Sequence, residues 1–172
     1  MVENRIRPEE RLRFTYDQIV SGLFQGSAPD EGEKLKQQGF SILVLCAEEH
    51  QPESRRFPGL EAVIHAPNDD NGLTMSPSER SIALRAAALV ARYVRDGKNV
   101  LVTCRAGRNR SGLVVALALH IMTGKSGRLC LERVRKFRQD ALIGGPFVKF
   151  LESLPAKSRL VTHPEAFSAR VR

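Results

Sequence analysis

The sequence predicts an α/β fold, in which helices flank a central, mostly parallel β-sheet. Short apolar runs alternate with helical patterns along the chain, and this alternation is typical of parallel sheets. Two of the runs, Phe40–Leu45 (FSILVL) and Asn99–Thr103 (NVLVT), are nearly continuously apolar, as strands covered on both faces are. A chain of 172 residues with 42% hydrophobic residues fits one domain with its own core.

The N-terminal half predicts two further strands, a short helix and a loop. We expect a first strand at Gln18–Phe24 and a weaker one at Leu60–His65. A short helix at Glu31–Gln38 is expected to end at Gly39. Pro67–Thr74 (PNDDNGLT) is rich in turn-forming residues and predicts a loop.

Four more helices complete the fold, one before and three after a strand at 99–103. The clearest start is a capping box of Ser76 and Glu79 with Pro77 at the first helical position, and this helix runs to about Arg95. The later elements are a buried helix at Leu113–Met122, one capped by Ser126 that reaches about Arg138, and a short one at Pro146–Leu154. The predicted core spans about residues 14–155, and a basic tail follows at 156–172.

Composition and charge restrict the class of protein only loosely. The net charge of +8 favours anionic partners, such as an acidic protein or an anionic membrane surface. The basic run Lys125–Arg138 could serve such a partner or be a solvated helix face, and no base-reading motif indicates nucleic acid. Three cysteines without metal-like spacing favour free thiols, and no signal peptide is evident, so we expect a soluble, cytoplasmic protein that is monomeric by default.

The segment that carries chemistry is Val100–Gly112 (VLVTCRAGRNRSG). A buried strand delivers Cys104 to the carboxyl edge of the sheet, where α/β proteins place their ligands. The residues Arg105, Ala106, Gly107, Arg108, Asn109 and Arg110 then precede a helix. Backbone N–H groups in such a loop, together with the helix N-terminus, form a site for a phosphate group.

The same loop supplies side chains suited to phosphate chemistry. The planar guanidinium of Arg110 can hold two phosphoryl oxygens at once. The positive field of the loop favours a thiolate at Cys104, which would be the nucleophile. Ser111 can donate a hydrogen bond to that sulfur when it leaves. Cys46 and Cys130 are expected to be small core residues.

This loop resembles that of the protein tyrosine phosphatase superfamily, in which Cys is followed by five residues, Arg, and Ser or Thr. It is most similar to the compact dual-specificity branch, and the resemblance extends over about Ile19–Leu154. Leu23–Pro29 (LFQGSAP) is similar to the family's opening LYLGSxxP, and Ile42–Glu48 resembles its next strand. The resemblance implies a phosphatase fold and hydrolysis through a cysteinyl-phosphate, without a metal or organic cofactor.

The resemblance also indicates a general acid. The family places an acidic residue thirty-odd positions before the Cys, and Asp70 lies 34 positions before Cys104. Asp69 is an alternative, since a shift of one residue in a loop is easily misjudged. Both carboxylates could also be turn-formers, and a metal site with His65 lacks recognised ligand spacing.

The sequence leaves the substrate class open. Phosphotyrosine, phosphoserine or phosphothreonine proteins fit the branch. Relatives that act on lipid phosphates often carry basic residues at the loop positions of Arg105 and Arg108, so a phosphoinositide or another phospholipid is an alternative. The family usually has His where this chain has Thr103, which raises the possibility of a phosphate-binding pseudophosphatase with little turnover.

Overall fold

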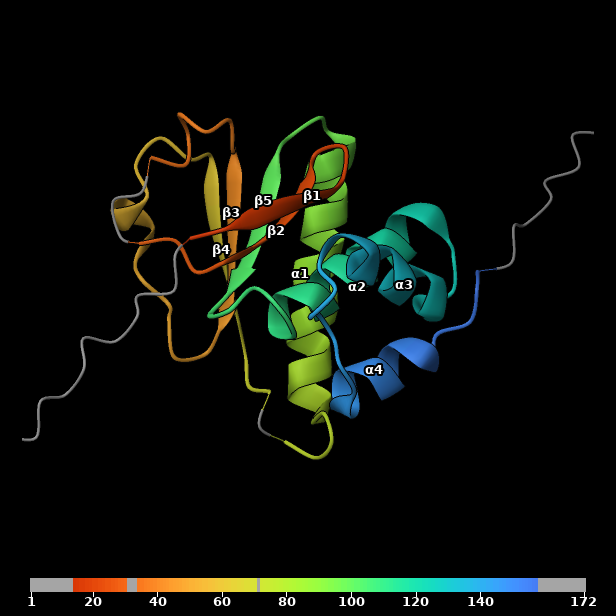
Figure 1. The fold of residues 1–172 in the computed structure, drawn as a ribbon. Coiled ribbons are helices and arrows are strands. Elements are labelled where there is room, and N and C mark those ends of the chain that lie inside the picture. The colour runs from red at the N-terminus through yellow and green to blue at the C-terminus, as the bar shows by residue number, and fades with distance from the viewer. Residues whose placement is uncertain (1–13, 31–33, 71, 158–172) are drawn as a thin grey trace, which may run out of the picture.

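A computed structural model describes residues 14–30, 34–70 and 72–157 of the chain (Figure 1). Its centre is a five-stranded sheet in the order β1-β2-β5-β3-β4. The strands are β1 (Tyr16–Val20), β2 (Leu23–Ser27), β3 (Ile42–Ala47), β4 (Ala62–Asn68) and β5 (Val100–Cys104). Neighbours are parallel except for β1, which pairs with β2 in antiparallel fashion at one edge. The predicted α/β class with a mostly parallel sheet is confirmed.

The single first strand predicted at Gln18–Phe24 is wrong. The chain forms a hairpin there, and Gly22, with a φ of 76°, lies in the turn between β1 and β2. Glycine enters this left-handed region without the steric cost that a Cβ imposes. Ile19 and Leu23 are both buried on either side of the turn, so the apolar pattern continues through it and hides it from periodicity.

Two other predictions need correction. Within 34–39 the chain forms turns, with hydrogen bonds such as Gln37 N to Lys34 O and Gly39 N to Lys36 O, and no regular helix. The start of the predicted helix, 31–33, lies outside the described residues. The weak strand expected at Leu60–His65 is β4, which continues through Pro67 and Asn68 and so takes up the start of the predicted loop.

The described residues form four α-helices: α1 (Pro77–Arg95), α2 (Arg110–Thr123), α3 (Gly127–Phe137) and α4 (Gly145–Glu152). A 3-10 helix, η1, covers Ser54–Arg56. The capping box of α1 is present, because Ser76 N donates to Glu79 Oε2 at 2.6 Å and Glu79 N donates to Ser76 Oγ at 3.2 Å. α2 begins at Arg110, three residues before the predicted start. None of the helices in the described ranges is both long and apolar enough to span a bilayer.

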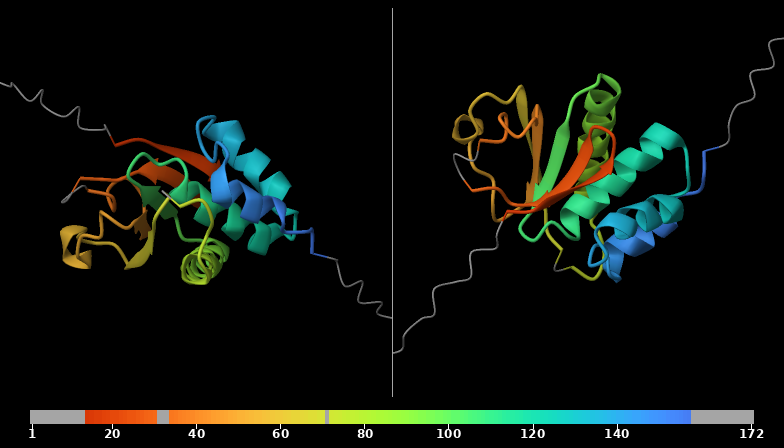
Figure 2. Two further views of the ribbon diagram at one scale, coloured as in Figure 1. Left: turned by 90° about the horizontal axis from the view of Figure 1, so that it is seen from below. Right: turned by 45° about the horizontal axis from the view of Figure 1, so that its top comes forward.

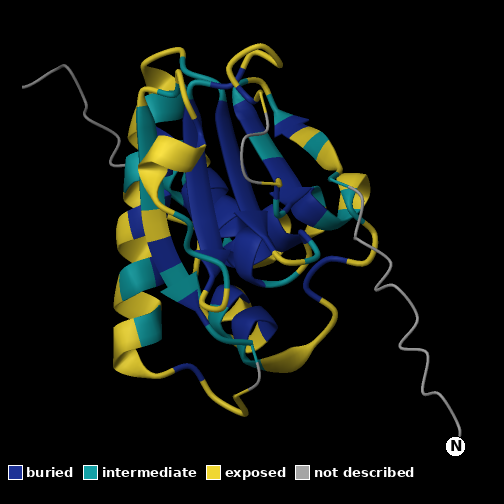
Figure 3. Cartoon of the chain, turned by 90° about the vertical axis from the view of Figure 1, so that its left-hand side faces the viewer, coloured by how far each residue is buried: buried dark blue, intermediate teal, exposed yellow. Residues whose placement is uncertain are grey.

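The two faces of the sheet are covered differently (Figure 2). α2, whose residues Leu113–Leu119 are all buried, packs against one face together with α1 in the larger hydrophobic cluster. The other face carries Leu43, Leu45 and Leu101, which are covered by side chains from the connecting segments, including Phe40 and Phe57. The central strands β3 and β5 are accordingly buried, while the outer sides of the helices are exposed (Figure 3).

The parallel strands fix where a functional site can form. β2, β5, β3 and β4 run in the same direction, so their carboxyl ends lie at the same edge of the sheet. The residues at or just after these ends are Ser27, Cys104, Glu48 and Asp69. Segments far apart in the sequence therefore meet at this edge.

Candidate active site

The loop between β5 and α2 forms one tight turn around the end of the sheet. Cys104 is the last residue of β5 and Arg110 is the first of α2. Gly107 has a φ of 67°, and a Cβ built on it would lie 2.5 Å from the carbonyl carbon of Gly26. Only glycine fits there, because the loop lies directly on β2 and turns in the left-handed region.

Cys104 lies at the floor of this loop with little exposure, 3%. Its Sγ is 3.2 Å from Ser111 Oγ, so the structure brings the predicted nucleophile and the predicted sulfur partner together. Leu45 of β3 pairs with Thr103 of β5, so Cys46, the next residue of β3, lies near Cys104. Burial, together with the charge of Cys104, raises the pKa of Cys46 well above its ordinary value. Cys46 is thus a neutral core thiol, as predicted.

Arg110 is held from one side, which leaves a defined edge of its guanidinium available. Glu49 accepts hydrogen bonds from both Nη1 and Nη2, the latter at 2.9 Å, and the Asn68 carbonyl accepts from Nη1 at 3.4 Å. A guanidinium has five N–H donors. The two that remain are Nε–H, which has no hydrogen-bond partner among the described residues, and one on Nη2. This pair is the side-on edge suited to two phosphoryl oxygens.

Glu49 and Arg110 shift each other's pKa. The hydrogen bond from Arg110 lowers the pKa of Glu49 below its ordinary value of 4.5, despite partial burial, which acts in the opposite direction. Burial by itself would lower the pKa of Arg110, but the hydrogen bond to Glu49 and the charges of Asp70 and Cys104 outweigh it and raise that pKa. The guanidinium is therefore a fixed cation beside the sulfur.

Glu49 was missed by the sequence reasoning. It is placed two residues after the end of β3, at the same sheet edge as Cys104. Its position just after a parallel strand could have marked it as a site residue, because the carboxyl ends of all parallel strands meet at this edge. Its pairing with Arg110 could not be predicted, since Glu49 and Arg110 are 61 positions apart in the sequence.

Both candidate acids line the cleft in front of Arg110. The cleft has a volume of about 560 Å³ and is lined by Glu48, Glu49, Asp69, Asp70, Arg105 and Arg110. Asp70 Oδ2 is 3.6 Å from Arg110 Nε, on the free edge of the guanidinium. The geometry thus brings Asp70 to where a bound phosphate would lie, and Asp69 lines the same cleft.

The two basic residues inside the loop point to different places. Arg105 lines the cleft with the four carboxylates. Arg108 lines a separate hollow of about 380 Å³ together with Ala106 and Arg138. Asn109 ties the loop to the segment before α4, since its Oδ1 accepts from Leu142 N at 3.1 Å. Arg105 and Arg110 are therefore the loop side chains that line the cleft.

Thr103, the residue before Cys104, does not contact the loop through its hydroxyl. The side chain is buried, and its Oγ1 donates to the Val44 carbonyl at 3.0 Å. This bond joins β5 to β3 and satisfies the buried hydroxyl. Thr103 is thus part of the sheet.

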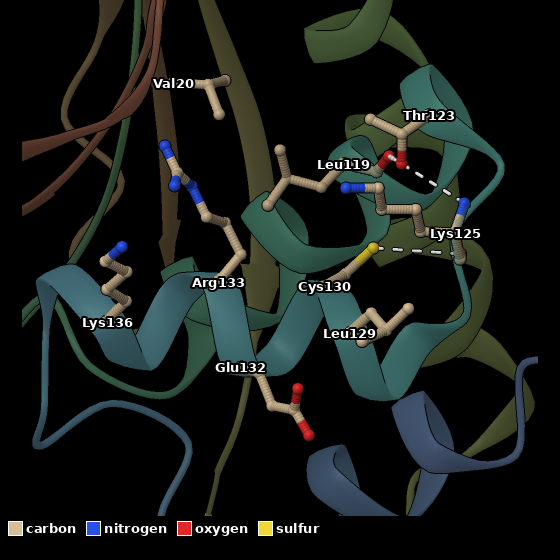
Figure 4. A pocket seen from close by; sticks show the side chains of 9 residues that line it. All are labelled: Val20, Leu119, Thr123, Lys125, Leu129, Cys130, Glu132, Arg133 and Lys136. Atoms are coloured by element: carbon tan, nitrogen blue, oxygen red, sulfur yellow. Dashed lines mark hydrogen bonds between the residues drawn. The ribbon is translucent and has the colours of Figure 1, made fainter.

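A further pocket of about 400 Å³ lies beside α3 and the end of α2 (Figure 4). Cys130 lines it, and burial raises the pKa of this thiol. Its Sγ lies 3.9 Å from the Lys125 carbonyl. None of the predicted site residues lines this pocket, and Cys130 is a buried residue as expected.

Comparison with solved structures identifies similar folds. A mouse putative dual specificity phosphatase complexed with zinc tungstate is 26% identical, with a TM-score of 0.64 over 80% of this chain and 86% of that one. The active form of Tk-PTP is 28% identical, with a TM-score of 0.64 over 80% and 95%. PTPMT1 is 20% identical and has a TM-score of 0.67 over 80% and 92%. No family model and no curated protein matches the sequence.

The sheet order, the loop around Cys104 and these neighbours define the class as an α/β phosphatase fold of the dual-specificity type. This chain is a compact, dual-specificity-like member of the protein tyrosine phosphatase superfamily. The neighbours are phosphatases, which supports phosphatase activity for this chain.

Proposed function

We propose that this chain hydrolyses phosphomonoesters through a cysteinyl-phosphate on Cys104. The observation that carries the proposal is the cluster of Cys104, Ser111 and Arg110, in which a thiol 3.2 Å from a hydroxyl lies beside a cation whose Nε makes no hydrogen bond within the described residues. Substrate phosphate would occupy the side-on edge of this guanidinium and the backbone N–H groups of residues 105–110.

The first step transfers the phosphoryl group to the enzyme. The Cys104 thiolate attacks phosphorus in line, the bond to the ester oxygen breaks, and Asp70 gives its proton to the leaving oxygen. Arg110 and the loop N–H groups stabilise the charge on the three equatorial oxygens. The position of Asp70 beside the guanidinium edge supports this assignment.

The second step regenerates the thiolate. Asp70, now ionised, takes a proton from water, the water oxygen attacks phosphorus, and the S–P bond breaks with its electrons returning to sulfur. Ser111 donates a hydrogen bond to the departing thiolate. No metal or cofactor takes part, so we expect EDTA to leave the rate unchanged.

A phosphorylated tyrosine, serine or threonine in a protein is the substrate class we favour. Four carboxylates line the cleft against two arginines, and Arg108 faces a different hollow. A polyanionic headgroup would meet repulsion at this mouth, whereas a peptide carries a single phosphate and adjustable flanking charges.

The second candidate is a phospholipid phosphatase. Arg105 in the cleft supports it, and PTPMT1, which is similar in fold, has been solved in complex with PI(5)P. A pseudophosphatase is a third possibility, raised by Thr103. Because the hydroxyl of Thr103 is satisfied within the sheet, the alternative rests on the missing imidazole alone.

The test is phosphate release from a matched panel. Phosphotyrosine, phosphoserine and phosphothreonine peptides, a dispersed phosphoinositide and a generic aryl phosphate are assayed at equal concentration. We expect release from aryl phosphate and phosphopeptides, and its abolition in Cys104→Ser, which should still bind phosphate.

Each other outcome assigns a different function. Release from the phosphoinositide alone would replace the protein substrate with a lipid. Phosphate binding without turnover on any substrate would identify a pseudophosphatase. Full turnover by Cys104→Ser would end the nucleophile assignment.

A further inference from the structure

Three carbonyl groups of the loop are bound by β2 and the residue that follows it. Ala28 N donates to the Arg105 carbonyl at 3.3 Å. The amide nitrogen of Gln25 donates to the carbonyls of Gly107 at 3.0 Å and of Arg108 at 3.2 Å. One side chain, from a strand 82 positions earlier, thus supplies two of these three bonds.

These bonds determine where the loop N–H groups point. In a trans peptide unit the C=O of one residue and the N–H of the next point in opposite directions. With the carbonyls of 105, 107 and 108 turned toward β2, the N–H groups of 106, 108 and 109 are turned away from it. Gln25 therefore orients two N–H groups of the phosphate loop.

The burial of Gln25 indicates that its amide does more than fill space in the core. Its side chain is 0% exposed, and its Oε1 has no hydrogen-bond partner among the described residues. A buried acceptor without a partner destabilises a fold. Leucine would fill similar space on this strand without that cost, so the amide is accounted for by its two bonds to the loop.

We propose that Gln25 is a positioning residue that holds the phosphate loop in its anion-binding form. The hydroxyl of Thr103, immediately before Cys104, bonds within the sheet and gives the loop no support. The carbonyls of Gly107 and Arg108 are supported instead from the neighbouring strand, through the side chain of Gln25. This inference deepens the proposed function and rests on it.

The test compares Gln25→Leu with the wild-type protein by three measurements: kcat and KM for an aryl phosphate, the inhibition constant of inorganic phosphate, and the thermal midpoint. We expect phosphate inhibition and kcat/KM to weaken roughly five- to hundredfold, because two loop carbonyls lose their donor. The thermal midpoint should fall only modestly, because two loop carbonyls lose their donor while one orphan acceptor is removed at the same time.

A matched control separates loop positioning from general stability. Val134→Ala alters a fully buried residue on α3, and it should lower the thermal midpoint while leaving phosphate inhibition unchanged. Equal phosphate inhibition in Gln25→Leu and wild type would overturn the inference. An absence of both phosphate binding and turnover in the wild type would instead overturn the proposed function.

A second variant tests the same inference if Gln25→Leu fails to fold. Gln25→Glu places a carboxylate against the same two carbonyls, and only its protonated form can donate to one of them. We expect the activity of this variant, relative to wild type, to rise as pH falls. A ratio that stays flat with pH would contradict the positioning role.

Discussion

Asp70 and Asp69 both line the cleft, and the position of the guanidinium distinguishes them at the scale of single residues. Asp70 lies 3.6 Å from Arg110 Nε, on the edge where a phosphate would bind. A proton donor must reach the leaving oxygen of that phosphate. The geometry therefore favours Asp70 as the acid.

We predict that Asp70→Asn lowers kcat by about 10²–10⁴-fold on a substrate with a poor leaving group, the usual contribution of a positioned proton donor. Asp69→Asn is the matched control and should have a small effect. Steady-state kinetics on an alkyl phosphate measure both. The reverse ranking would transfer the role to Asp69.

Glu49 is expected to orient Arg110 rather than to react. We predict that Glu49→Gln lowers kcat/KM roughly tenfold, mainly through KM, because the amide cannot accept both guanidinium bonds. Glu53→Gln, another exposed acid with an arginine partner, is the control. Unchanged KM in Glu49→Gln would contradict the orienting role.

The ion pair of Glu49 and Arg110 predicts a pH dependence of stability. The pKa of Glu49 in the folded protein lies below its ordinary value of 4.5, so its stabilising contribution is complete above 4.5 and is lost as pH falls through the lower folded value. The contribution is under about 1 kcal/mol, since Glu49 is half-exposed. The thermal midpoints of wild type and Glu49→Gln should therefore converge at acid pH.

At the scale of elements, the loop and β2 form one unit. Gly107 packs against the backbone of Gly26 and Ser27, and its φ of 67° is unfavourable for other residues. We predict that Gly107→Ala lowers kcat/KM more than tenfold, because the Cβ would push the loop off β2 and turn its N–H groups away from phosphate.

Gly97→Ala is the matched control for this change. Gly97 has a φ of 77°, but a Cβ there meets nothing within 4 Å. The Gly97→Ala substitution should therefore lower the free energy of unfolding by about 1–2 kcal/mol and leave activity intact. Equal kinetic effects of the two variants, measured together with their thermal midpoints, would show that the contact with β2 does not matter.

Elements with a strong local signal were predictable from the sequence, and those that depend on tertiary contacts were not. The capping box of α1 and the apolar strand β5 are encoded by adjacent residues. The β1–β2 hairpin was missed because Ile19 and Leu23 are buried on both sides of its turn. The helix expected at Glu31–Gln38 has a helical composition, but its described part forms only turns, with Leu35 buried against the sheet.

The same distinction holds for the site. Cys104, Arg110 and Ser111 belong to one continuous motif, and the sequence alone could bring them together. Glu49, just after β3, contacts Arg110 from 61 positions earlier in the sequence. Gln25, in β2, contacts Gly107 from 82 positions earlier. Nothing in a single sequence specifies such pairs, because they depend on the order of strands in the sheet.

At the scale of the whole molecule, the parallel sheet assembles the cleft. The carboxyl ends of β3, β4 and β5 bring Glu49, Asp70 and Cys104 to one edge. The net charge of +8 does not describe this cleft, since four carboxylates line it. The excess positive charge lies elsewhere on the chain, and the local charge determines which substrates can approach.

The account depends on a covalent phosphoryl intermediate at one sulfur. The most direct measurement is mass spectrometry of the protein mixed with aryl phosphate and quenched in acid during turnover. We predict one added phosphoryl group on the peptide that contains Cys104, most abundant in Asp70→Asn at a pH where breakdown is slow. Continued turnover with no phosphoryl group on Cys104, or with one on another residue, would contradict it.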